Sequence, residues 1–132
     1  LRVHSMTLEK LDHLVLPVSD IDAIAMFYTT YLGMEKRTFG EGRVALHFGN
    51  QKINLHPAGW DYEPKARVSI AGSADLCFIV SERVESLHTK LVHSGVEVIE
   101  GPVERTGATG RLRSIYIRDP DGNLIELSND VE

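Results

Sequence analysis

The sequence predicts an α+β fold made of two similar modules that pack against each other. The main observation is an internal repeat: residues 12–19 align with residues 74–81, and Leu32-Gly33-Met34 aligns with Ser94-Gly95-Val96 at the same offset of 62 residues. In each copy an apolar strand pattern precedes apolar residues at helical spacing. Because one such unit cannot bury its apolar face alone, the two copies are expected to share a core.

The first module is expected to contain a strand, a helix and then two or three further strands. The first strand covers about Leu11 to Val18, with alternate side chains on opposite faces. Ser19 or Asp20 fits the N-cap of the helix and Gly33 fits its C-terminal stop. The later strand segments, separated by glycine-containing turns, are 35–38, 44–48 and 52–56.

The second module repeats this order after a linker at residues 57–73, where prolines and glycines argue against regular structure. A strand at 75–80 leads to a helix that is expected to begin at a Ser81 cap and to stop at Gly95. Two closing strands, 114–118 and 124–128, are joined by the turn 119–123. The second copy also carries the additional segment Pro102–Arg113, which we expect to be a mobile loop that serves as a lid.

Length and charge restrict the function classes. The 132 residues predict one domain at residues 9–130, with modules at about 9–57 and 74–130, while residues 1–8 are expected to be an N-terminal segment or an expression remnant. A net charge of −5 disfavours nucleic acid as a partner, and no apolar run is long enough to span a membrane. The single cysteine, Cys77, excludes an internal disulfide and favours a reducing compartment such as the cytoplasm.

Strand alternation divides the strands near the repeat ends into an apolar face and a polar face. The apolar face is expected to lie against the helices and holds Leu14, Leu16, Ile53, Leu55, Leu76, Phe78, Ile125 and Leu127. The opposite face holds His13, Asn54, His56, Asp75, Cys77 and Glu126, with His47 and Tyr116 on neighbouring strands. Polar groups on apolar strands need partners, and a divalent metal ion is one partner that suits carboxylates and imidazoles together.

Three parts of the sequence resemble one known superfamily. They are Leu11-Asp12-His13-Leu14, Phe27-Tyr28 with Leu32-Gly33-Met34, and the final segment Asp119-Pro120-Asp121-Gly122-Asn123-Leu124-Ile125-Glu126-Leu127. Over residues 9–130 the chain resembles the vicinal oxygen chelate superfamily of glyoxalase I, extradiol dioxygenases and bleomycin-resistance proteins. Within it, Asn54-Leu55-His56, Glu63-Pro64-Lys65-Ala66 and the segment 101–108 resemble the glyoxalase-domain-containing protein 5 group.

The resemblance implies two βαβββ modules whose strands form a curled mixed sheet around a metal site. The family's ligand positions correspond to His13, Asn54, Asp75 and Glu126 in this sequence. Glyoxalase I has a carboxylate at the position of Asn54, and most relatives have a histidine at the position of Asp75. We therefore predict His13, His56, Asp75 and Glu126 as metal ligands, with His56 replacing Asn54, and Asn54 and Tyr116 as substrate-binding residues.

Four of these residues also have a structural interpretation. His13 can be a buried histidine that is hydrogen-bonded to the backbone, and Asp75 can cap the turn at the start of its strand. His56 precedes Pro57 and can be a solvated strand end, whereas Tyr116 can be a packed core residue.

The function expected from the resemblance is that of a divalent-metal-dependent lyase or isomerase of glyoxalase type. The metal (Ni, Mn, Co, Zn or Fe) would chelate two neighbouring oxygens of a small substrate, and Glu126 would move the proton. An Fe(II) extradiol dioxygenase with His13, His56 and Glu126 as ligands is the alternative enzyme. A non-catalytic protein that binds a small toxic compound is the third reading, and a homodimer is expected.

Overall fold

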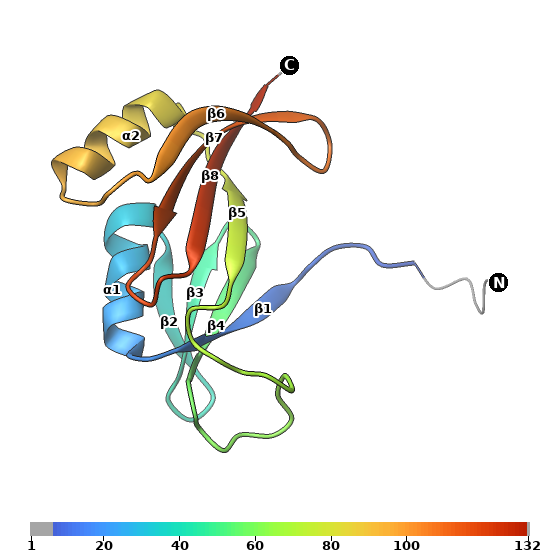
Figure 1. Cartoon of the computed structure of the whole chain (residues 1–132). Coiled ribbons are helices and arrows are strands. Elements are labelled where there is room, and N and C mark those ends of the chain that lie inside the picture. The colour runs from blue at the N-terminus through green and yellow to red at the C-terminus, as the bar shows by residue number, and fades with distance from the viewer. Residues whose placement is uncertain (1–6, 132) are drawn as a thin grey trace.

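The computed structural model describes residues 7–131 and shows two βαβββ modules (Figure 1). The first module contains β1 (His13–Val18), α1 (Ile21–Leu32), β2 (Glu35–Phe39), β3 (Arg43–Phe48) and β4 (Gln51–Pro57). The second contains β5 (Asp75–Ile79), α2 (Val84–His93), β6 (Glu100–Thr106), β7 (Arg111–Arg118) and β8 (Leu124–Val131). Of the expected N-terminal segment, residues 1–6 lie outside the described part of the chain, and residues 7 and 8 belong to no helix or strand.

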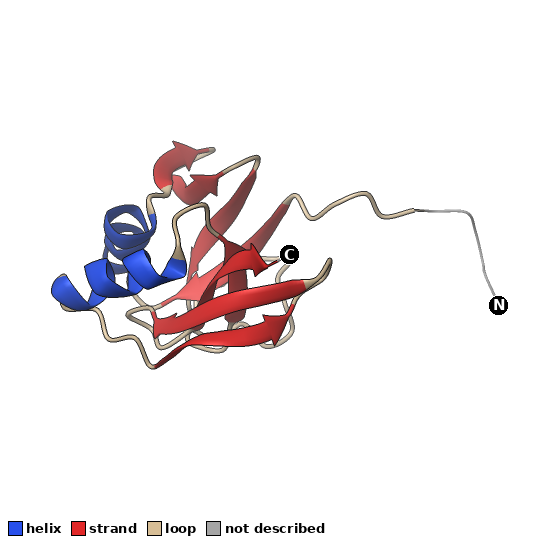
Figure 2. Ribbon diagram, turned by 90° about the horizontal axis from the view of Figure 1, so that it is seen from above, coloured by secondary structure: helices blue, strands red, loops and turns tan. Residues whose placement is uncertain are grey.

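Each module forms its own four-stranded mixed sheet. The strand orders are β1-β4-β3-β2 and β5-β8-β7-β6, so the first strand of each module lies parallel to the last. The remaining pairings are antiparallel. The two helices lie together on one side of the molecule and the strands on the other (Figure 2). The predicted α+β class and the repeated βαβββ order are confirmed, with two curled sheets that do not close into a barrel.

The core lies between the sheets and the helices, as the alternation pattern predicts. Leu16, Ile53, Leu55, Ile125 and Leu127 are at most 2 % exposed. Leu14, Leu76 and Phe78 are partly buried against the same cluster, which also contains Tyr28 of α1 and Leu91 of α2. The polar residues of the opposite strand face therefore point away from the shared core.

The two helices begin in different ways. Asp20 caps α1, because its Oδ1 accepts a hydrogen bond from the Ala23 N–H, and Gly33 ends the helix in the left-handed region with φ of 70°. The prediction of Ser81 as the cap of α2 is wrong, because the helix begins later, at Val84, after Arg83. The Val84 N–H donates instead to the Asn129 side chain of β8 at 2.8 Å.

The predicted lid at Pro102–Arg113 is also wrong in its extent. Most of this segment is strand, since β6 and β7 pair from Val103 opposite Ser114 to Thr106 opposite Arg111. Only residues 107–110 form the turn, closed by a hydrogen bond from the Gly107 N–H to the Gly110 carbonyl. Among the described residues, β6 is an edge strand with β7 as its one hydrogen-bonded neighbour, and such a position tolerates Gly101 and Pro102.

Candidate functional site

The repeat places two candidate pairs in equivalent positions. In the parallel pair β1–β4, His13 is opposite Lys52, and Asn54 lies two residues further on. In β5–β8, Asp75 is opposite Leu124, and Glu126 lies two residues further on. A displacement of two residues is about 7 Å along a strand. Each sheet therefore presents two nearby polar groups on the face that points away from the core, called the site face below.

His56 does not belong to the immediate surroundings of His13. It pairs with Pro17, four residues along the strand from the partner of His13. The two histidines are thus about 13 Å apart along the strands. A metal ion binds imidazole nitrogens at only about 2 Å. The strand register therefore places His13 and His56 too far apart to bind the same metal ion.

Glu126 lies in a hydrogen-bonded cluster on the second sheet. Its Oε2 accepts a hydrogen bond from the Ser114 hydroxyl at 2.7 Å and lies 3.4 Å from the Ser128 hydroxyl. The two serine oxygens are 2.6 Å apart, and Cys77 Sγ lies 3.4 Å from Ser128 Oγ. Burial, and then the Glu126 charge, raise the pKa of Cys77 although the Ser128 contact lowers it, so the thiol stays protonated at neutral pH.

Tyr116 lies beside Glu126 in the register and is held by Arg105. Its hydroxyl oxygen accepts a hydrogen bond from Arg105 Nε at 2.9 Å, and Arg105 also contacts Glu100 at 3.1 Å. Burial is the main cause that raises the pKa of Tyr116, and the Glu126 charge acts in the same direction. The tyrosine is therefore a neutral hydrogen-bond donor next to the carboxylate.

The end of the first sheet that is remote from His13 carries a cluster around Arg43 that the sequence patterns did not predict. Arg43 lies 3.4 Å from His56 Nε2, and its guanidinium carbon is 4.6 Å from the ring centre of Phe39 and 5.2 Å from that of Tyr62. Burial and the Arg43 charge lower the pKa of His56, so the imidazole is neutral at pH 7. Residues 43, 45 and 47 lie on the same face of β3 because side chains alternate along a strand. This alternation is the sequence signal that could have predicted Arg43 on the site face.

Asn54 is nearly buried on the same face, with 4 % of its surface exposed. Its Oδ1 is buried and finds no hydrogen-bond partner among the described residues. An unpaired buried acceptor costs about 1–3 kcal/mol, and the binding role expected for Asn54 stays a prediction.

The two halves of the candidate set approach each other at the edges of the sheets. His13 and Cys77 line one cavity of about 110 Å³, together with Leu14, Phe48 and Phe78. His13 Nδ1 also lies 2.9 Å from Asp12, and Asp75 is exposed. Among residues 7–131, however, no three His, Cys, Asp or Glu side chains are grouped closely enough to hold a metal ion. The residues of a single chain therefore do not fit a resident metal without a further contribution.

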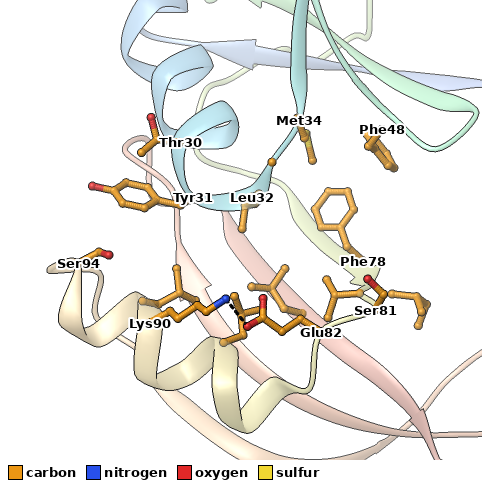
Figure 3. A pocket seen from close by; sticks show the side chains of 16 residues that line it. Thr30, Tyr31, Leu32, Met34, Phe48, Phe78, Ser81, Glu82, Lys90 and Ser94 are labelled. Atoms are coloured by element: carbon orange, nitrogen blue, oxygen red, sulfur yellow. Dashed lines mark ion pairs between the residues drawn. The ribbon is translucent and has the colours of Figure 1, made fainter.

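A larger cavity of about 600 Å³ lies on the other side of the sheets, between the helices (Figure 3). Its lining includes Leu32, Phe48 and Phe78, and the ion pair between Lys90 and Glu82 at 2.7 Å lies at its side. None of the predicted site residues lines this cavity.

The sequence profile of the Glyoxalase/Bleomycin resistance protein/Dioxygenase superfamily matches residues 10–127. The chain belongs to this superfamily. Two relatives share more than half of their aligned residues with it. Virulence protein STM3117 of Salmonella typhimurium strain LT2 is 53% identical over 126 residues, which is 96% of this chain and 88% of the relative. The glyoxalase domain-containing protein RDO1 of Mycosarcoma maydis is 52% identical over 124 residues, or 94% of this chain and 70% of the relative.

The solved structure of STM3117 has the same fold. It superposes with a TM-score of 0.93 and covers 96% of this chain and 100% of its own. The metallothiol transferase FosB of Shouchella clausii strain KSM-K16 is more distant, at 27% identity over 89% of this chain and 77% of its own length. Within the part of the chain that the structure describes, no helix is long and apolar enough to cross a membrane.

Proposed function

We propose that the protein is a divalent-metal-dependent enzyme of glyoxalase type that acts on a small substrate with neighbouring oxygen atoms. The observation that carries this proposal is the surroundings of Glu126. This half-buried carboxylate is fixed by the Ser114 hydroxyl and lies beside the neutral donor Tyr116 on the site face. A positioned carboxylate next to a hydrogen-bond donor suits proton transfer at a carbon beside a carbonyl group.

The proposed roles follow from these contacts. Glu126 takes the proton from one substrate carbon and returns it to the neighbouring carbon, while Ser114 keeps the carboxylate in place. Tyr116 donates its hydrogen bond to the substrate oxygen on which negative charge develops, because its own oxygen already accepts from Arg105. The positive charge of Arg105 further stabilises that developing charge.

We propose that a second copy of the chain completes the metal site, so that the working protein is a homodimer. His13, Asp75 and Glu126 are the proposed ligands, since the register removes His56 from their surroundings. Within the described residues β1 and β5 each have one hydrogen-bonded neighbour, and their site-face residues Val15 and Ile79 are 44% and 56% exposed. Open strand edges with exposed apolar side chains favour association with another chain. The single cysteine fits a reducing compartment, and we place the protein in the cytoplasm.

Turnover measured in the absence and in the presence of oxygen tests the proposed chemistry. We expect protein loaded with Ni, Co, Mn or Zn to isomerise the hemithioacetal of methylglyoxal in the absence of oxygen, and Glu126→Gln to lower kcat by roughly 10²- to 10⁴-fold. Lys36→Met, an exposed change on β2, serves as the control and should retain activity. Oxygen consumption on catechols by the Fe(II) form, without anaerobic turnover, would favour the dioxygenase instead.

A further inference from the structure

Two cations meet at the ring of Phe39 on the first sheet: Arg43 of the cluster described above, and Lys52, which starts opposite His13 and reaches Phe39 with its side chain. Arg43 and Lys52 both lie on the site face, because they share it with Asn54 and His56 in the register of β3 and β4. Within residues 7–131 neither side chain forms an ion pair with Asp or Glu. Both are only partly exposed, so water compensates their charges incompletely.

Aromatic rings hold these cations in place. The Arg43 guanidinium lies over the rings of Phe39 and Tyr62, and Lys52 Nζ is 4.1 Å from the ring centre of Phe39. Tyr62 comes from the linker and also meets His56 edge to face, with ring centres 4.9 Å apart. Such contacts fix the direction of a guanidinium, whose N–H groups can then bind a carboxylate in a bidentate manner.

Asn54 supplies independent evidence for a ligand at this position. It lies between Lys52 and His56 along the same face of β4, and its buried Oδ1 has no partner among the described residues. A polar ligand that reaches this amide would remove the cost of the unpaired oxygen. Next to it, Tyr62 stacks with the exposed ring of Trp60 at an interplanar angle of 29°, which leaves a flat apolar surface beside the charges.

We propose that Arg43 and Lys52, with the rings of Phe39, Tyr62 and Trp60, form a subsite for small carboxylates that carry a flat apolar body. The carboxylate binds the Arg43 guanidinium, and the body lies against the linker rings. The inference rests on the proposed function, because it names the substrate class of the same site face. His56, which lies 3.4 Å from Arg43, would then be the partner of the guanidinium when no carboxylate is bound.

Benzoate binding to the metal-free full chain tests the subsite without any turnover. Trp60 is the only tryptophan, so its fluorescence reports on the neighbouring rings directly, and calorimetry gives the affinity. We expect saturable binding of benzoate and much weaker binding of benzamide, which lacks the charge, and of acetate, which lacks the ring. Arg43→Met should weaken benzoate binding roughly tenfold or more, and Lys52→Met should weaken it as well.

Lys36→Met is the matched control, since it removes the same charge from β2 on the other face and should leave the benzoate affinity within twofold, about the effect of a distant surface change. Circular dichroism shows whether each variant folds. If Arg43→Met does not fold, the benzoate affinity of Lys52→Met provides the test. Absent benzoate binding, equal binding of benzoate and acetate, or an affinity unchanged in both variants would overturn the proposal. Because no metal takes part, these outcomes are independent of whether the metal-dependent reaction occurs.

Discussion

Asp119, in the turn between β7 and β8, is a buried carboxylate that accepts hydrogen bonds from three residues. Its donors are the Tyr28 hydroxyl at 2.7 Å, the Asp121 N–H, and both the N–H and the side-chain amide of Asn123. Tyr28 belongs to α1 of the first module, whereas the other donors belong to the second. The segment 119–127, which resembles the superfamily, therefore contains a hydrogen bond that links the two modules as well as the candidate catalytic Glu126.

We expect Asp119→Ala to lower the free energy of unfolding by about 3 kcal/mol, because several buried donors lose their acceptor together. Urea denaturation followed by circular dichroism measures this loss. Asp130→Ala, an exposed change on β8, is the control and should stay within about 0.5 kcal/mol of the wild type. Equal stabilities of the two variants would show that the Asp119 contacts contribute nothing.

At the scale of elements, α2 obtains its N-terminal cap from a strand that is distant in the sequence. Asn129 of β8 accepts from the Val84 N–H and donates to the carbonyls of Val80 at 3.0 Å and Glu82 at 2.9 Å. The side chain thus replaces the local cap that the sequence leads one to expect at Ser81.

Two alanine variants, Asn129→Ala and Ser81→Ala, test which residue caps α2. We expect Asn129→Ala to destabilise the protein by about 1–2 kcal/mol, as the loss of a helix cap does, and Ser81→Ala to change stability by less than about 0.5 kcal/mol. Thermal unfolding of both variants gives the comparison. A larger loss from Ser81→Ala would mean that the helix begins where the local pattern places it.

Local sequence patterns predicted the helices and strands well, but they did not predict the contacts between residues that are distant in the sequence. The alternation of β1 and β8 and the ends of α1 depend on neighbouring residues, and they were predicted from the sequence. The Asn129 cap bridges 45 residues, and β6 is a strand only because β7 pairs with it, so neither has a local signal. The site follows the same rule: alternation placed His13 and Glu126 on the site face, but the distance from His13 to His56 depends on strand register.

At the scale of the whole molecule, the candidate residues of one chain lie on two different sheets. The first sheet carries His13, Asn54 and the Arg43 cluster, and the second carries Asp75, Glu126 and Tyr116. Each half is well ordered by its own strands and hydrogen bonds, yet the described residues of one chain do not assemble a metal-binding group. We propose that two copies of the chain together provide the missing combination.

Complementation between two inactive variants tests whether the metal site is shared between two copies, with Co²⁺ binding by metal-depleted protein as the measurement. We predict that His13→Ala and Glu126→Gln each lose Co²⁺ binding when alone, whereas His56→Ala retains it. After the two inactive variants are unfolded and refolded together, about one quarter of the wild-type sites should return, because half of the dimers then contain one intact pair of halves. A mixture that binds no more Co²⁺ than the separate variants, or single variants that bind like the wild type, would contradict a metal site shared between two copies.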